Sequence, residues 1–485
     1  MKKLLLVYLL PATLLSHMSQ AQDKWGLKRC VDYALANNVS IKQADVQARL
    51  AKLALEQSKL QRIPTLVFGT GAGVNSGNSL NPTNYTINTQ TFFYNNFSLQ
   101  SSIVLFNGFN LQHVLAANRY AWQAALATTD KTRNDISLTV ANAYLQVLLS
   151  REQAEAARAK LALSQSQLEV TRKQVNTGTL PELNAAELES QVAQDSSTYI
   201  SLLGQIQLNV LGLKAYMGMD AGTAFEVDTP PVDQIPVELL VNLEPEAVYA
   251  LAVVNQPQQK ADALQIESSR QNVKAANGAR YPMISLGASL GTNFNTTPLT
   301  QYQSTTIAIP PSNPIRIGHV EGSGTAVLLD STSYTTVNST HTPYFKQLNS
   351  YFNQSIGINI SVPILNNGSL RTNYARSKLN LRNVELQRDQ DNLTLKNNIY
   401  QAYTAASTAL QKYEANKISL AAASKSADYA RKRYAVGMLN TIDLLTNENN
   451  FFNAQINLLS SQYDYVFKMK VLEFYKGLGI RLTKD

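Results

Sequence analysis

Two stretches of this chain contain neither glycine nor proline over a length that helices of globular proteins seldom reach. They run from residue 109 to 177 and from 369 to 436. Glycine and proline are the residues that most readily interrupt a helix, so each stretch predicts one long helix. At 1.5 Å per residue, such a helix would extend for about 100 Å.

A helical hairpin is predicted at the end of each stretch. Gly178 and Gly437 suit the left-handed residue that ends a helix. Each glycine is followed by an N-cap residue and, three positions later, by an acidic residue, in the segments 179–182 and 440–443. A return helix is therefore expected to start almost directly after each turn, from about Leu180 in the first half.

The two hairpins indicate an internal two-fold sequence repeat. From residue 111 to 218 the first half aligns with the second at a constant offset of 259 residues and without a gap. Gly178 then matches Gly437, and Tyr144 matches Tyr403. The predicted organisation is a signal peptide at 1–21, a first repeat at 22–218, a Pro-rich connector at 219–245, a second repeat at 246–479 and a C-terminal tail at 480–485.

The first 21 residues have the pattern of a secretory signal peptide. Lys2 and Lys3 precede an apolar stretch, and a small-residue cleavage site follows at 19–21. The mature chain is therefore expected to leave the cytoplasm. The net charge is +8, with Lys and Arg scattered among acidic and amide residues, which argues against nucleic-acid binding. Cys30 is the only cysteine and is predicted to be a buried structural thiol.

Alternating apolar and small or polar residues predict four β-strands. After residue 21 there is no run of about 18 apolar residues, the length of a transmembrane helix. Each predicted strand has about the ten residues that a tilted membrane-crossing strand requires. The strands are predicted at 66–74, 97–105, 284–291 and 356–364. Helices are expected before each pair of strands, at 25–62 and 246–280. A loop is expected at 75–90, and a Ser, Thr and Pro-rich surface insertion at 295–350.

Four such strands cannot close into a barrel within one chain. In lipid, an open sheet edge leaves unpaired backbone groups at a cost of several kcal/mol each, so several chains must share one barrel. Two chains would give eight strands, whose interior side chains nearly fill the barrel. Three chains would give twelve strands and leave room for a pore.

The sequence gives little support for catalysis or for a bound metal or cofactor. His17 belongs to the predicted signal peptide, and His113, His319 and His341 have no metal-ligand or catalytic-triad spacing. The glycines of Gly69-x-Gly71-x-Gly73 alternate as on a strand face, without the helix and Lys-Ser/Thr pair of a phosphate-binding loop. We therefore expect a protein that is not an enzyme.

Taken together, these features resemble the TolC-like outer-membrane efflux proteins of Gram-negative bacteria. The closest motif is Tyr434-x-x-Gly437 followed by Ile442-Asp443-Leu444-Leu445, and Trp25-x-Leu27 with the segment 30–38 looks like the start of Bacteroidetes-type members. The resemblance implies an α+β membrane protein: a trimeric, 12-stranded β-barrel in the outer membrane, with four strands per chain, that continues into a long periplasmic α-helical barrel. It also implies docking through a periplasmic adaptor to an inner-membrane pump, and export of small molecules or proteins.

The resemblance further assigns roles to the two turns. The segments Val175–Glu182 and Tyr434–Asp443 would form the periplasmic tip that meets the adaptor. The residues expected to dock are Thr177, Gly178, Thr179, Val436, Gly437 and Met438.

A gate is expected beside these turns. Asp443 has the position of a carboxylate that rings the periplasmic entrance, one from each chain, although it also suits a capping role beside Asn440. Leu439 replaces a basic residue that locks the closed state in some members, and Asn184 replaces its acidic partner. Closure is therefore expected to rely on helix packing and on a hydrogen bond of Tyr434.

Two other readings stay open at this point. A periplasmic coiled-coil protein with a structural or adhesive role would use the helices as a scaffold and keep the strands in water. A simple diffusion porin would need no helices of about 100 Å. The sequence identifies neither the exported substrate nor the pump and adaptor, and the insertion at 295–350 could plug the channel, bind a partner outside or be disordered.

Overall fold

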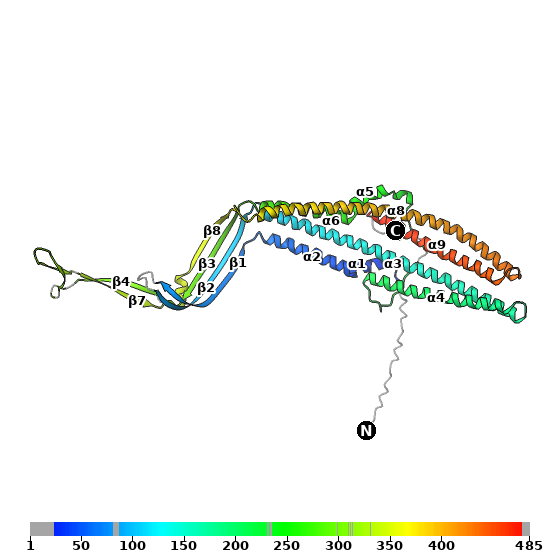
Figure 1. The fold of residues 1–485 in the computed structure, drawn as a ribbon, viewed down its shortest axis with the longest axis horizontal. Coiled ribbons are helices and arrows are strands. Elements are labelled where there is room, and N and C mark those ends of the chain that lie inside the picture. The colour runs from blue at the N-terminus through cyan, green and yellow to red at the C-terminus, as the bar shows by residue number, and fades with distance from the viewer. Residues whose placement is uncertain are drawn as a thin grey trace, which may run out of the picture. The chain divides into compact units, whose positions relative to one another are not determined.

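The computed structural model describes residues 24–80, 87–229, 232, 235–297, 299–308, 310, 312, 314–329 and 331–477. The predicted signal peptide and C-terminal tail lie outside these residues. The chain divides into a helical unit and a second unit that contains the sheet (Figure 1). The helical unit comprises the described residues of Met1–Leu55, Ala116–Gln271 and Lys378–Asp485, and the second comprises those of Glu56–Leu115 and Asn272–Ser377.

Two helices of 67 residues each confirm the predicted long helices. They are α3 (Asn110–Asn176) and α8 (Ser369–Ala435), whose first residues are 259 positions apart. The return helices are α4 (Glu182–Met217) and α9 (Thr441–Tyr475), and each packs back toward its long helix (Figure 1). Among the described helices, none combines the length and the apolar character needed to cross a membrane.

Each helix predicted before a strand pair is in fact broken in two. The segment predicted at 25–62 forms α1 (Leu27–Asn37) and α2 (Val39–Leu60), and that predicted at 246–280 forms α5 (Pro245–Asn255) and α6 (Pro257–Gly278). The prediction of continuous helices was therefore wrong. In the second case Pro257 has no backbone N–H to continue the helix.

The residues at the two breaks hold the ends of the return helices. Asn38 is extended, its Oδ1 accepts a hydrogen bond from the Ser40 N–H at 2.8 Å, and its Nδ2 donates to the Tyr216 carbonyl at the end of α4 at 2.7 Å. Gln256 is also extended, and its Nε2 donates to the Phe474 and Tyr475 carbonyls at the end of α9. These bonds satisfy carbonyls that have no partner within their own helices.

Two apolar cores lie beside these breaks. The first includes Cys30, Tyr144, Leu148 and Met217, and the Tyr144 hydroxyl donates to the Asp228 carbonyl of the connector at 2.6 Å. Cys30 is fully buried, which confirms the structural thiol, and burial raises the pKa of that thiol to about 12. The second core contains Leu243, which ends the short 3₁₀ helix η2 (Leu240–Leu243), with Val248, Ala252, Ile399, Ala406, Met469 and Leu472.

The second unit is built on a four-stranded antiparallel sheet. Its strands, in the order β1, β2, β3, β8, are Thr65–Leu80, Ile87–Phe106, Met283–Asn295 and Asn353–Ser361 (Figure 1). The loop predicted at 75–90 is wrong, because β1 and β2 stay paired as far as Leu80 and Ile87. The last strand ends at Ser361 instead of residue 364, since Pro363 has no N–H to donate to a ladder.

The register places the apolar residues on one face of the sheet. Phe68 pairs with Leu99, Leu99 with Leu290, and Leu286 with Ile358. Residues that pair across strands share a face, and successive residues along a strand alternate between faces. The opposite face carries small and polar residues, including Gly73, whose missing Cβ would lie 2.8 Å from the Tyr94 hydroxyl.

The insertion at 295–350 is not a plain loop. Strand β4 (Leu299–Ala308) pairs with β7 (Ser331–Thr340), and β5 (Ile315–His319) pairs with β6 (Ala326–Leu329). A short helix, α7 (Tyr344–Ser350), then leads into β8. The predicted long surface loop is therefore replaced by two hairpin ladders and a helix.

Candidate functional site

The turn between α3 and α4 is organised by Gly178. Its φ of +75° is left-handed, its N–H donates to the Val175 carbonyl at 2.8 Å, and the Thr179 N–H donates to the Gln174 carbonyl at 2.8 Å. This pair of bonds is the Schellman arrangement that ends a helix. The predicted cap by Thr179 is wrong, because α4 begins at Glu182 with Pro181 in the N-cap position. The Thr179 hydroxyl lies 3.1 Å from that of Thr177 instead.

The turn between α8 and α9 repeats the same geometry. Gly437 has a φ of +74°, its N–H donates to the Tyr434 carbonyl at 3.0 Å, and the Met438 N–H donates to the Arg433 carbonyl at 2.8 Å. The predicted cap of α9 is confirmed here, because Asn440 Oδ1 accepts a hydrogen bond from the Asp443 N–H at 2.7 Å.

The two turns present their predicted docking residues to solvent. Thr177, Gly178 and Thr179 are exposed in the first turn, and Val436, Gly437 and Met438 are exposed in the second. Val436 and Met438 leave more than 65% of their surface exposed, although both are large apolar residues. An exposed apolar turn of this kind is suited to contact with another protein.

The predicted gate residues differ in exposure within the single chain. Asp443 is exposed, whereas Leu439 and Asn184 are half-buried. The Tyr434 hydroxyl lies 3.1 Å from that of Thr171, a fully buried residue of α3. This hydrogen bond joins α8 to α3, and therefore links the two hairpins close to their turns.

Two Arg–Glu pairs brace the hairpins a short distance from the turns. Arg172 of α3 pairs with Glu189 of α4, and Arg431 of α8 pairs with Glu448 of α9. The second pair is bidentate, at 2.5 and 2.7 Å, and Glu448 has a side-chain exposure of 7%. The hydrogen bond to Glu448 raises the pKa of Arg431. At the offset of 259 residues, Arg172 aligns with Arg431 and Glu189 aligns with Glu448. The sequence repeat could therefore have identified both pairs.

A buried polar cluster ties the first hairpin to α9. The Asp195 carboxylate, 3% exposed, forms an ion pair with Lys160 Nζ at 2.9 Å. It also accepts hydrogen bonds from Ser164 Oγ at 2.5 Å and Gln191 Nε2 at 2.8 Å. Lys160 also donates to Asn449 Oδ1 of α9 at 2.5 Å. A buried carboxylate needs such partners. The aligned residues of the second half are Ser419 and Ala454, so this cluster occurs in only one of the two hairpins.

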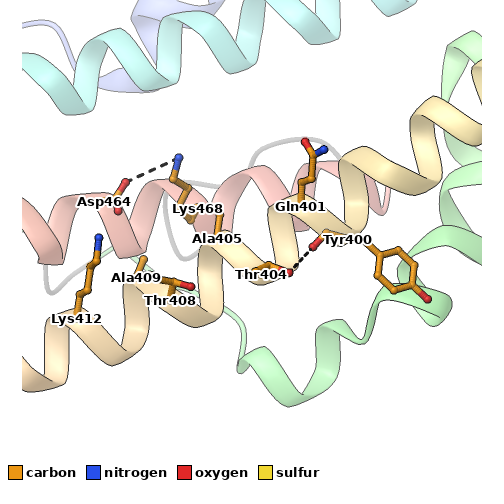
Figure 2. A pocket seen from close by; sticks show the side chains of 9 residues that line it. All are labelled: Tyr400, Gln401, Thr404, Ala405, Thr408, Ala409, Lys412, Asp464 and Lys468. Atoms are coloured by element: carbon orange, nitrogen blue, oxygen red, sulfur yellow. Dashed lines mark hydrogen bonds and ion pairs between the residues drawn. The ribbon is translucent and has the colours of Figure 1, made fainter.

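A groove of about 520 Å³ lies farther along α8 and α9 (Figure 2). Ala405 and Ala409 give it a floor of small side chains, and Lys412 stands at its edge. Asp464 and Lys468 of α9 form an ion pair at 3.9 Å on the other side. Within the described residues, no group of three or more His, Cys, Asp or Glu side chains could hold a metal ion.

We expect Glu448→Gln to destabilise the protein more than Glu189→Gln does. Arg431 would lose a charged partner that is nearly buried, at a cost of about 1–3 kcal/mol, toward the low end because the Arg431 side chain is 35% exposed. Glu189 is the matched control, since it holds the same position in the other hairpin but its side chain is 46% exposed. Denaturant unfolding of both purified variants measures the difference in their free energy of unfolding. Equal losses of stability would show that the burial of Glu448 does not strengthen its pairing with Arg431.

Comparison with known proteins agrees with this architecture. The model of the family "outer membrane efflux protein" matches residues 30–219 and 326–475. The outer membrane efflux protein BepC of Brucella suis biovar 1 is 24% identical over 393 residues, which cover 80% of this chain and 72% of BepC. The crystal structure of the Campylobacter jejuni CmeC outer membrane channel has a TM-score of 0.71 at 16% identity, covering 95% of this chain and 87% of CmeC.

A crystal structure of CusC is also similar, with a TM-score of 0.74 at 17% identity, and covers 94% of this chain and 93% of CusC. The family match favours an export channel over the coiled-coil scaffold and the simple porin. The chain belongs to the outer membrane efflux protein family, and it is an outer-membrane export channel that extends into the periplasm.

Proposed function

We propose that three copies of this chain form one twelve-stranded β-barrel that continues into a periplasmic helical barrel, and that this assembly is the exit duct of a tripartite efflux or secretion system. The observation that carries the proposal is the four-stranded sheet, in which β1 and β8 are the outer strands. In lipid, the free edges of such a sheet would be costly unless a neighbouring chain paired with them. Twelve strands leave room for a pore.

The two faces of the sheet fit this arrangement. Leu66, Ile356, Ile358 and Ile360 of the apolar face are each more than 60% exposed in the single chain, which suits contact with lipid. The opposite face, with its glycines and serines, would then line the pore. The equal lengths and matching starts of α3 and α8 support an internal repeat, so each chain would contribute two similar hairpins to the helical barrel.

We expect Ile358→Arg to impair assembly of the trimer, at a cost of about 2–4 kcal/mol if the residue lies near the bilayer midplane. Asn359→Arg is the matched control, because the adjacent residue has the same depth but belongs to the polar face. The yield of heat-resistant oligomer in the outer-membrane fraction measures the effect. If Ile358→Arg and Asn359→Arg assemble equally well, the apolar face is not in contact with lipid.

The two turns are proposed to meet the periplasmic adaptor, through which an inner-membrane pump would connect. The support is their shared glycine geometry and the exposed apolar side chains of the second turn. The glycines also end their helices, and that role is compatible with docking.

Photo-crosslinking amino acids at Thr177 and Val436 should capture a periplasmic partner in cells. Val327 of β6 is the control position, since it is exposed but belongs to the insertion. Capture from Val327 alone would rule out docking at the turns.

Asp443 is proposed to form a ring of three carboxylates at the periplasmic entrance, with Leu439 and Asn184 leaving no ion-pair lock and Tyr434 holding the helices through a hydrogen bond. Exposure of Asp443 in the single chain supports this role. Such a ring would attract cations and bind multivalent ones. The capping geometry does not compete with it, because the backbone N–H of Asp443 makes the bond to Asn440 and leaves the carboxylate outside that contact.

Asp443→Asn should reduce cation preference and block by multivalent cations in single-channel recordings. The variant removes the charge but keeps the backbone hydrogen bond of the cap. Glu182→Gln, which removes an acid from the first turn of α4, is the matched control. An unchanged preference in Asp443→Asn, or an equal loss in Glu182→Gln, would show that Asp443 forms no selective ring.

A further inference from the structure

Helix α7 is fastened to the edge of the sheet by one buried side chain. Gln347 is 2% exposed, its Oε1 accepts a hydrogen bond from the Asn295 N–H at 2.6 Å, and its Nε2 donates to the Asn295 carbonyl at 2.9 Å. Pairing of β3 with β8 stops at Gly291 and Asn353. The Gln347 amide therefore takes the place of a strand at this free stretch of β3, and it fixes α7 there.

The apolar face of the sheet receives α7. The Tyr344 ring lies 4.7 Å from that of Phe294, and its hydroxyl donates to Asn95 Oδ1 at 2.8 Å. Phe294 and Asn95 are register partners, and by alternation they share a face with Leu290 and Leu99. The helix thus covers the end of the apolar face and is not placed on the polar one.

The length of the apolar face, from its far end to the end that α7 covers, matches the thickness of a membrane. Ile284 and Phe294 lie at the two ends of the apolar face of β3, ten residues apart. Ten residues span about 33 Å along a strand, which at a tilt of about 40° corresponds to ~25 Å of height, the apolar band of outer-membrane barrels. Within this unit, α3 begins after β2 at the Ile284 end of the sheet, so α7 lies at the opposite end from the start of α3.

The exposed side chains of α7 suit a lipid–water boundary. Phe345 is 81% exposed and lies edge-on to Tyr344, the neighbouring Lys346 is exposed, and Phe352 beyond the helix is 56% exposed. Aromatic rings collect at the headgroup level of membranes, and lysine extends its ammonium toward anionic headgroups. The combination of aromatic and basic side chains is that of an interfacial anchor.

We propose that α7 is a lipid anchor at the outer boundary of the membrane, with Phe345 among the upper acyl chains and Lys346 facing anionic headgroups. The inference rests on the proposed barrel, because it requires that the apolar face contact lipid. The last segment of the insertion thereby fixes the height of the barrel in the outer leaflet.

Site-directed spin labelling tests the depth of α7 in the full chain, reconstituted in vesicles that contain anionic lipid. Nitroxide is attached to Phe345→Cys, to Ile358→Cys on the apolar face of β8, and to Val327→Cys in β6. Native Cys30 stays unlabelled, because it is fully buried and its thiol pKa is raised to about 12. Collision with oxygen, which concentrates in lipid, is compared with collision with a water-soluble nickel chelate.

The expected oxygen-to-nickel ratio at 345 lies between a high value at 358 and a low value at 327. A water-like ratio at 345 with a lipid-like ratio at 358 would overturn the anchor and leave the barrel standing. A label at 345 that neither reagent reaches would mean that protein covers α7, such as a second copy of this chain, and would also overturn it. A water-like ratio at 358 would overturn the barrel itself.

Discussion

After each long helix the chain reverses its direction at one glycine in the left-handed conformation, and the helical unit depends on that reversal. Because Gly178 and Gly437 satisfy the last carbonyls of α3 and α8 within the turn, the return helices can start within a few residues. The far ends of α4 and α9 therefore come back to Asn38 and Gln256, whose amides bind their terminal carbonyls. Both apolar cores form at this level, where the chain segments from distant parts of the sequence meet.

The long helices and the faces of the sheet could be predicted because glycine, proline and alternation are local signals. Finer features of the fold could not be predicted from the sequence, for physical reasons. The periodicity of apolar residues continues across Asn38, so only its extended backbone reveals the break. The Asn- and Thr-rich segment 75–90 has the composition of a loop, yet pairing between β1 and β2 overrides local preference. Thr179 seemed a good cap, but Pro181 occupies the position that a cap needs.

Contacts between distant helices were least accessible from the sequence. The Thr171–Tyr434 hydrogen bond joins residues 263 positions apart, and no pattern within either helix points to the other. The Arg–Glu pairs differ, because the offset of the two halves preserves both partners and would have identified them. The Lys160–Asp195 pair could not be found in this way. Its residues align with Ser419 and Ala454 in the second half, so the sequence repeat does not preserve it.

The glycines of β1 also determine how the side chains of the neighbouring strand β2 lie on the sheet. On the polar face of the sheet, Tyr94 lies flat across Gly73 and Asn96 lies close over Gly71, in space that a Cβ would fill. A methyl group at either position would force the larger side chain to stand away from the strand. The glycines thus let bulky polar groups lie along the sheet, and in the proposed barrel the bore would be set in part by positions that carry no side chain at all.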